Sequence, residues 1–215
     1  DQNYLRDINK LSVNKIYTKD VLDSALGVGS VYEGMLNHLD ALVSDSTISS
    51  YRAFAYDWRF APDSIVQTGT AYQQGVLDLI KVVEVLSQEA GNNKVTIIGH
   101  SNGGLLAKAL VAELEKRGEA DVVDQMIFIG TPHIGTPKAI ATILHGYDQA
   151  KDFMGIPVIQ SEVAREVINN MPGAYGLLPT PAYFSAVSEP IVTIDNATAT
   201  EALFAAYGST ISNYQ

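Results

Sequence analysis

The sequence predicts an α/β fold in which helices flank a mostly parallel sheet. Across the middle of the chain, short apolar segments rich in β-branched residues alternate with longer segments whose apolar residues recur at helical spacing. This alternation requires crossover connections, which join parallel strands and cover the faces of the sheet with helices. Functional side chains are therefore expected where strands end, because the carboxyl ends of parallel strands meet at one edge.

The first part of the chain is expected to alternate short strands with helices. The expected elements are a short strand at Ile16-Tyr17, a helix over Val31–Val43, a strand over Tyr51–Tyr56, a turn at Pro62-Asp63 and a helix over Thr70–Ala90. The last of these is the longest helical pattern, with Ile80 and Val83 on its expected buried stripe and Gly91 at its end.

The second part continues the alternation and then loses it. The expected elements are a strand over Val95–Ile98, a helix over Leu105–Leu114, a strand over Val122–Ile129, a rigid connection over Gly130–Pro137 and a helix over Lys138–Leu144. Beyond Tyr147 a helix over Val158–Asn170, a strand over Ile191–Ile194 and a short helix over Thr200–Tyr207 are expected. We expect a partial core over residues 1–146 and a cap or lid packed on it over residues 147–215.

Composition narrows the function. A net charge of −10 argues against nucleic acid or an anionic membrane surface as the main partner. No apolar run approaches the ~18–20 residues of a membrane span. The chain has no cysteine, no His-x-x-x-His pair and no close acidic cluster, so neither a metal nor another cofactor is expected. It begins at Asp1 without a leader, so we expect it to be processed, trimmed or excised; its compartment stays open, and secretion is one option.

The main chemical motif surrounds Ser101. Gly99-His100-Ser101-Asn102-Gly103 fits the G-x-S-x-G pattern between a predicted strand and a predicted helix. A nucleophilic serine at such a bend stands clear of the sheet, and glycines two residues to either side remove the Cβ atoms that would collide. The following helix directs its free N–H groups toward the bend, so the N–H of Asn102 is expected to donate to an oxyanion. Ser101 and Asn102 are the predicted catalytic residues.

A serine in a phosphate-binding turn is the alternative for this motif. The G-x-G-x-x-G spacing of dinucleotide-binding turns is absent here. The Gly-Lys-Ser/Thr of a P-loop is absent too. The context therefore favours acyl transfer through Ser101.

Four segments together resemble the lecithin:cholesterol acyltransferase family, α/β-hydrolases that include lysosomal phospholipases and bacterial lipase-like members. They are Tyr56-Asp57-Trp58-Arg59, Ile98–Gly104, Ile129–Ala139 and Met171–Pro179. The resemblance runs from about residue 30 to the end of the sequence. It implies a serine hydrolase or acyltransferase that acts on lipid esters, with Ser101 as the nucleophile. Asn102 stands where the family more often has methionine, and its backbone N–H is the group that matters.

A serine nucleophile needs a histidine base and an acid, which in α/β-hydrolases follow the serine in the order acid, then histidine. The histidines are at positions 38, 100, 133 and 145, and none follows Asp195, the best late acid. His133 lies beyond the next strand, and no suitable acid lies between it and Ser101. We therefore expect a central fragment of a larger hydrolase. Its remaining segments, as partners, would supply the acid, the histidine and the second oxyanion donor, and this piece alone would be inactive.

Other residues leave alternatives open. Asp57, Trp58 and Arg59 are expected at the rim of the site, either tying a loop or contacting substrate. The apolar stretches Tyr175–Leu178 and Tyr183-Phe184 fit either a lid over a lipid chain or an ordinary core. The function itself has two alternatives: a hydrolase of the same fold for another ester, amide or peptide, and a non-enzymatic binding or assembly module that retains the hydrolase fold.

Overall fold

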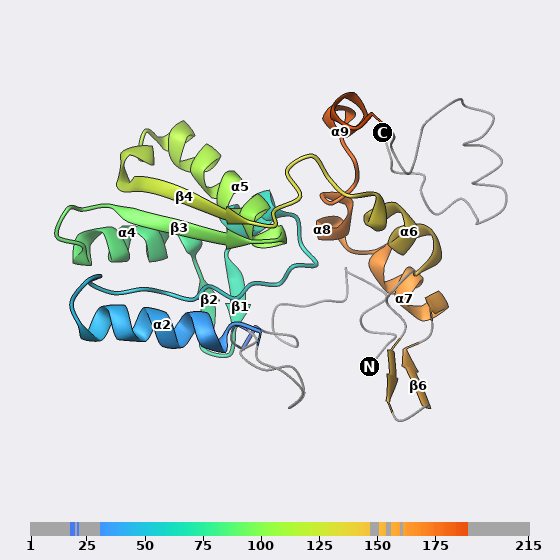
Figure 1. The fold of residues 1–215 in the computed structure, drawn as a ribbon, viewed down its shortest axis with the longest axis horizontal. Helices are drawn as coiled ribbons and strands as arrows, with labels where there is room; N and C mark the ends of the chain where they lie inside the picture. Colours follow the sequence, from blue (N-terminus) through green and yellow to red (C-terminus); the bar gives the residue numbers. More distant parts are fainter. Residues whose placement is uncertain are drawn as a thin grey trace. The chain divides into compact units, whose positions relative to one another are not determined.

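The computed structural model describes residues 18–19, 21, 31–146, 151–153, 156–159 and 161–188 (Figure 1). Two compact units make up the chain. Unit 1 comprises Asp1–Ser12, Trp58–Ala61 and Pro132–Gln215, and unit 2 comprises Val13–Asp57 and Pro62–Thr131. The elements expected at residues 16–17, 191–194 and 200–207 lie outside the described residues. The predicted division between residues 146 and 147 stays a prediction.

A parallel strand pair with a crossover helix forms the centre of unit 2. Strand β3 (Val95–His100) pairs in parallel with β4 (Val123–Ile129), so that His100 lies opposite Ile129. Helix α5 (Asn102–Arg117) and the short 3₁₀ helix η2 (Ala120–Val122) connect them. Apolar side chains at positions 106, 110 and 114 of α5 are buried, as the alternating pattern predicts. These two strands and this helix confirm the sequence prediction.

Helix α4 (Leu79–Glu89) is shorter than predicted. The expected helix over Thr70–Ala90 is wrong in its first part, which forms an antiparallel hairpin of β1 (Thr70–Tyr72) and β2 (Gly75–Leu77). Gly75 adopts φ +132°, which a helix does not allow. Asp78 then caps α4 with a side chain that accepts from the N–H groups of Ile80 and Lys81.

The segment before this hairpin differs from the prediction. Helix α2 (Glu33–Ser44) forms as expected, but residues 51–57 form no strand. Two of their backbone groups bond to side chains instead of a strand ladder: the carbonyl of Ala55 accepts from the Tyr72 hydroxyl, and the N–H of Asp57 donates to Thr70 Oγ1 at 3.1 Å. The expected turn at Pro62-Asp63 is the start of helix α3 (Pro62–Thr68), where proline fits the first helical position.

Unit 1 is built from short helices. They are α6 (Pro137–His145), α7 (Ser161–Ile168), α8 (Pro172–Tyr175) and α9 (Pro181–Ala186), together with a hairpin of β5 (Lys151–Phe153) and β6 (Ile156–Ile159). Ile143, Ile168, Met171 and Ala174 form a small buried core. The helix predicted over residues 138–144 is confirmed, whereas that predicted over 158–170 begins only at Ser161.

The described residues thus mix helices with small sheets, as an α/β fold does. The predicted mostly parallel sheet is represented there by the β3–β4 pair, while the β1–β2 and β5–β6 pairs are antiparallel. None of the helices in this part of the chain has the length and apolar character needed to cross a bilayer.

Candidate active site

Ser101 occupies a strained backbone conformation between β3 and α5. Its φ of +52° and ψ of −126° lie outside the regions that residues with a side chain prefer. Such a conformation costs about 1–3 kcal/mol and persists only where the surrounding structure enforces it. The residue is exposed, so its hydroxyl stands at the surface of unit 2 rather than within packing.

Backbone hydrogen bonds enforce this conformation. The N–H of Ser101 donates to the carbonyl of Ile129 at 2.8 Å, which ties the bend to the end of β4. The carbonyl of Ser101 accepts from the N–H of Gly104 at 3.0 Å, which starts the first turn of α5. The bend is therefore fixed from both the sheet and the helix.

Two glycines allow β3 and α5 to approach closely. A Cβ on Gly99 would lie 2.6 Å from the Cα of Gly104, and a Cβ on Gly104 would lie 1.9 Å from Thr131 Oγ1. The expectation that Gly103 makes the second close contact is wrong, because a Cβ there would meet only the Tyr56 hydroxyl, at 3.8 Å. The helix brings its third residue, not its second, onto the strand.

Two tyrosines lie beside the neighbours of Ser101. The hydroxyl of Tyr32 is 2.7 Å from Nδ1 of His100, and the rings meet edge to face with their centroids 5.6 Å apart. The hydroxyl of Tyr56 lies beside the side chain of Asn102. Burial, followed by the proximity of Tyr32, raises the pKa of Tyr56 to about 12, although the amide of Asn102 acts in the opposite direction. Tyr56 thus stays protonated over the ordinary pH range.

Sequence reasoning missed this pair of contacts. Tyr56 was named as the end of an expected strand and as the first residue of the Tyr-Asp-Trp-Arg segment, and Tyr32 was not singled out. The nearest hint of these contacts in the sequence was that both neighbours of the predicted nucleophile, His100 and Asn102, have polar side chains. The side-chain Oδ1 of Asn102 is buried and has no hydrogen-bond partner, so the amide is only partly satisfied.

The three residues expected at the rim of the site belong to different units. Asp57 belongs to unit 2, and Trp58 and Arg59 belong to unit 1. Trp58 is 53% exposed, so it is not a core residue, whereas Arg59 is buried. The carbonyl of Arg59 accepts from the N–H of Gly173 at 2.9 Å, and a Cβ on Gly173 would lie 2.1 Å from the carbonyl oxygen of Trp58. The backbone of this segment is therefore packed against α8.

A second contact in unit 1 joins two other segments of the resemblance. The N–H of Thr136 donates to the carbonyl of Leu177 at 2.8 Å, and the N–H of Thr180 donates to that of Ile134 at 3.0 Å. Gly135 has φ +83°, and a Cβ on it would lie 2.1 Å from the carbonyl oxygen of Leu178. Segments around residues 134–136 and 177–180 thus form one packed scaffold.

The other histidines and the tyrosines of the two apolar stretches lie in different environments. His38 is exposed on α2, His145 is exposed at the end of α6, and His133 lies in the turn that follows β4 in the sequence. Tyr183 is buried on α9, with its ring edge to face with Phe184 at 5.2 Å. The hydroxyl of Tyr175 donates to the carbonyl of Asn169 at 3.0 Å. Tyr183 is therefore a packing residue of unit 1.

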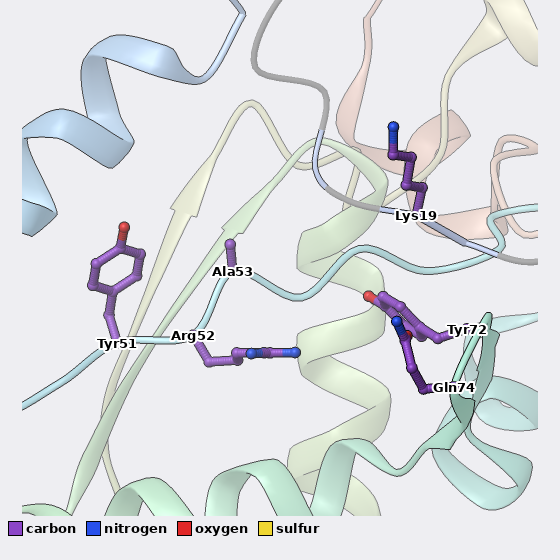
Figure 2. A pocket seen from close by; sticks show the side chains of 6 residues that line it. All are labelled: Lys19, Tyr51, Arg52, Ala53, Tyr72 and Gln74. Atoms are coloured by element: carbon purple, nitrogen blue, oxygen red, sulfur yellow. The ribbon is translucent and has the colours of Figure 1, made fainter.

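A separate open pocket of about 470 Å³ lies in unit 2 (Figure 2). Its lining residues are Lys19, Tyr51, Arg52, Ala53, Tyr72 and Gln74. Figure 2 shows that they come from the stretch before α2, the segment after it and the β1–β2 hairpin. Neither Ser101 nor Asn102 lines this pocket. Within the described residues, no group of three or more acidic or histidine side chains has the arrangement of a metal site.

The bend therefore combines a parallel strand, an exposed serine at positive φ and a helix packed closely through glycines, an arrangement typical of α/β-hydrolases. The model of the family Lecithin:cholesterol acyltransferase matches residues 15–210, so the chain belongs to this family. It is also similar to Phospholipase A(1) LCAT3 from Arabidopsis thaliana, at 23% identity over 173 residues. That match covers 78% of this chain and 37% of the relative, so the chain spans little more than a third of that protein's length. The resemblance drawn from the sequence is confirmed.

Proposed function

We propose that this chain carries the nucleophile of a lipid-ester hydrolase or acyltransferase, with Ser101 as the residue that is acylated. The observation that carries the proposal is the exposed, positive-φ serine between β3 and α5. Membership of the acyltransferase family and similarity to a plant protein named as a phospholipase support the substrate class. The geometry of the bend supports acyl transfer as the reaction type, because such a bend presents a serine hydroxyl to an acyl carbonyl.

The chemistry follows from the position of Ser101. Its Oγ attacks the acyl carbonyl carbon while a base removes the hydroxyl proton, and the alcohol then leaves from the tetrahedral intermediate. The acyl group is transferred to water or to a second alcohol, which regenerates the serine. The N–H of Asn102, at the start of α5, donates to the developing oxyanion, because the first N–H groups of a helix have no intrahelical acceptor.

The base and the acid, in this proposal, are not among the histidines and acids of these 215 residues. His100 is bonded to Tyr32 through Nδ1 and sits next to Ser101 in the chain, so it cannot fold back onto the serine. His38 and His145 are exposed on helices. The order serine, acid, histidine would place both partners later in a longer protein, and the relative is considerably longer than this chain.

The proposal includes a larger sheet. In parallel sheets both faces of a strand are normally covered. Here the side chains of Ile127 and Ile129 on β4 are 42% and 46% exposed. We infer an α/β-hydrolase core in which further helices cover the faces of this pair and further strands extend it, with residues 147–215 contributing a cap over it.

A fluorophosphonate probe tests the nucleophile directly. The full-length protein containing this chain is expected to be labelled, and Ser101→Ala is expected to abolish labelling because the attacking oxygen is lost. Ser64→Ala, which removes an exposed serine hydroxyl on α3, is the matched control and should be labelled like the wild type. Labelling that survives in Ser101→Ala would refute the proposal, and a folded, unlabelled wild type would favour the non-enzymatic binding module.

The substrate class needs its own experiment. A lipid-ester enzyme should hydrolyse p-nitrophenyl esters with a kcat/KM that rises with acyl length, because each buried CH₂ contributes roughly 0.8 kcal/mol. A flat profile across the series would instead favour the alternative of another ester, amide or peptide substrate.

A further inference from the structure

We propose that Tyr32 and Tyr56 are positioning residues that hold the two neighbours of Ser101, one on each side of the bend. We call the four residues Tyr32, His100, Tyr56 and Asn102 the tyrosine clamp. The inference rests on the proposed function of Ser101 and deepens it, since it names side chains that set the geometry of the nucleophile and of the oxyanion donor.

Side chains support the bend in addition to the backbone. A serine at φ +52° relaxes toward an ordinary conformation unless its neighbours are fixed. The backbone bonds to Ile129 and Gly104 fix the two ends of the bend. Each peptide group beside Ser101 thus has one backbone bond, and the side chains of His100 and Asn102 offer a second point at which each can be held.

Tyr32 holds the residue before the serine. Its hydroxyl lies 2.7 Å from Nδ1 of His100, and its ring stacks edge to face at 74° on the imidazole. Two contacts of different kinds therefore fix the orientation of this ring. Tyr32 directly precedes α2, so the contact also joins the start of that helix to the end of β3.

Tyr56 holds the residue after the serine. Its hydroxyl lies 3.8 Å from where a Cβ of Gly103 would be, beside the side chain of Asn102. The phenol thus reaches the first turn of α5 at the residue whose backbone N–H is the proposed oxyanion donor. Its partial burial, which raises its pKa to about 12, keeps the phenol neutral at working pH.

The clamp affects the reaction through position alone. Neither tyrosine needs to touch the substrate or to exchange a proton with it. Loss of either contact lets the bend relax, which moves Oγ of Ser101 relative to the N–H of Asn102. A misplacement of about 1 Å can reduce a rate roughly a hundredfold, so kcat is expected to fall while KM changes little.

The test compares Tyr32→Phe and Tyr56→Phe in the full-length protein. Each substitution removes one oxygen and keeps the ring, and each should slow fluorophosphonate labelling and kcat by about tenfold or more. Tyr51→Phe is the control, because it removes a hydroxyl that bonds to Asp40 on the surface, and should react at the wild-type rate. Thermal melts establish that all variants are folded.

A double substitution separates the clamp from a general effect of mutation. Asn102→Leu keeps the backbone N–H and removes the side-chain amide. Combined with Tyr56→Phe, it should slow labelling no more than the slower single variant does, because both remove the same contact. Additive effects would overturn the assignment of Tyr56 and Asn102 to one interaction.

A spectrum reports on the contact without using activity. In protein labelled with ¹³C at the tyrosine ring carbon that bears oxygen, Asn102→Leu should move the Tyr56 signal at neutral pH, because the group beside its hydroxyl is replaced. An unchanged Tyr56 signal would overturn the contact. A wild-type labelling rate in either tyrosine variant, with labelling abolished in Ser101→Ala, would overturn the clamp alone. Persistent labelling of Ser101→Ala would overturn the proposed function itself.

Discussion

At the scale of single residues, the bend at Ser101 exposes a hydroxyl at the cost of a strained backbone. A side chain at φ +52° is strained, and glycine is the residue that adopts this conformation without cost. The serine is retained there by bonds from β4 and α5. Stability measurements on substitutions at this position therefore report the strain separately from any chemistry.

Ser101→Gly should be more stable than Ser101→Ala by about 1 kcal/mol, since both remove the hydroxyl and only glycine relieves the strain. Denaturant unfolding of the two variants measures the difference. If Ser101→Ala is the more stable of the two, the backbone at this residue is not strained as described.

Gly99→Ala should lower the free energy of unfolding by about 1–3 kcal/mol, because the new methyl group would meet backbone atoms of α5 at 2.6 Å. Gly103→Ala is the matched control on the same bend: its nearest neighbour is the Tyr56 hydroxyl at 3.8 Å, and alanine is the better helix former by up to roughly 1 kcal/mol. Equal losses in the two variants would contradict the assignment of the close approach to Gly99.

Tyr56 should make stability depend on alkaline pH. Its pKa is about 12 in the folded state and about 10 in the unfolded chain, so below pH ~10 both states hold the proton. Between these values only the unfolded chain loses it, and the free energy of unfolding falls as pH rises. Urea unfolding at about pH 9 and about pH 11 should show a smaller loss for Tyr56→Phe than for the wild type. The same loss in both would place Tyr56 in solvent.

At the scale of elements, capping determined where α4 begins. The apolar pattern over residues 70–90 has the period of a helix, yet its first part became a hairpin. Gly75 supplies the positive φ of the turn, and Asp78 captures the first N–H groups of the helix. Period alone could not reveal this, because residues of the hairpin lie at the same spacing as a helical stripe.

Asp78→Ala should therefore destabilise the protein by about 1 kcal/mol, the usual effect of losing an N-cap. Asp78→Asn, which keeps an acceptor oxygen, should retain most of the stability. Thermal melts of the two variants measure the difference, and a neutral Asp78→Ala would show that the cap contributes nothing to α4.

The strand expected over residues 51–56 is a second error, because the structure has no strand there. Alternating large side chains favour a strand, but a strand also requires a partner, which the sequence of the segment does not contain. In the structure its backbone groups bond to the side chains of Thr70 and Tyr72. The β3–α5–β4 unit was predictable because its pairing is local, with one helix between two strands.

At the scale of the whole molecule, the family was predictable and the clamp was not. Four short segments carried the resemblance to the acyltransferase family, which the family match over residues 15–210 confirms. Tyr32 and His100, in contrast, are distant in the sequence, and so are Tyr56 and Asn102. Nothing in the residues between them signals a contact, since only the folded chain brings them together.

The 215-residue chain by itself should hydrolyse p-nitrophenyl esters at a negligible rate, because the proposed function places the triad base outside it and loss of that base reduces rates by several orders of magnitude. The same chain carrying Ser101→Ala is the control for background hydrolysis. Turnover that is clearly above this control would show that a histidine within the chain acts as the base.

The packing of Gly173 against Trp58 and Arg59 has a consequence for building hybrid proteins from members of this family. The carbonyl of Trp58 occupies the space that any side chain at position 173 would need. If a segment from a relative replaced only one of these two segments, its backbone would no longer fit the segment it packs against. The two segments should be exchanged as a matched set, and chimeras that respect this pairing should express and fold where single grafts fail.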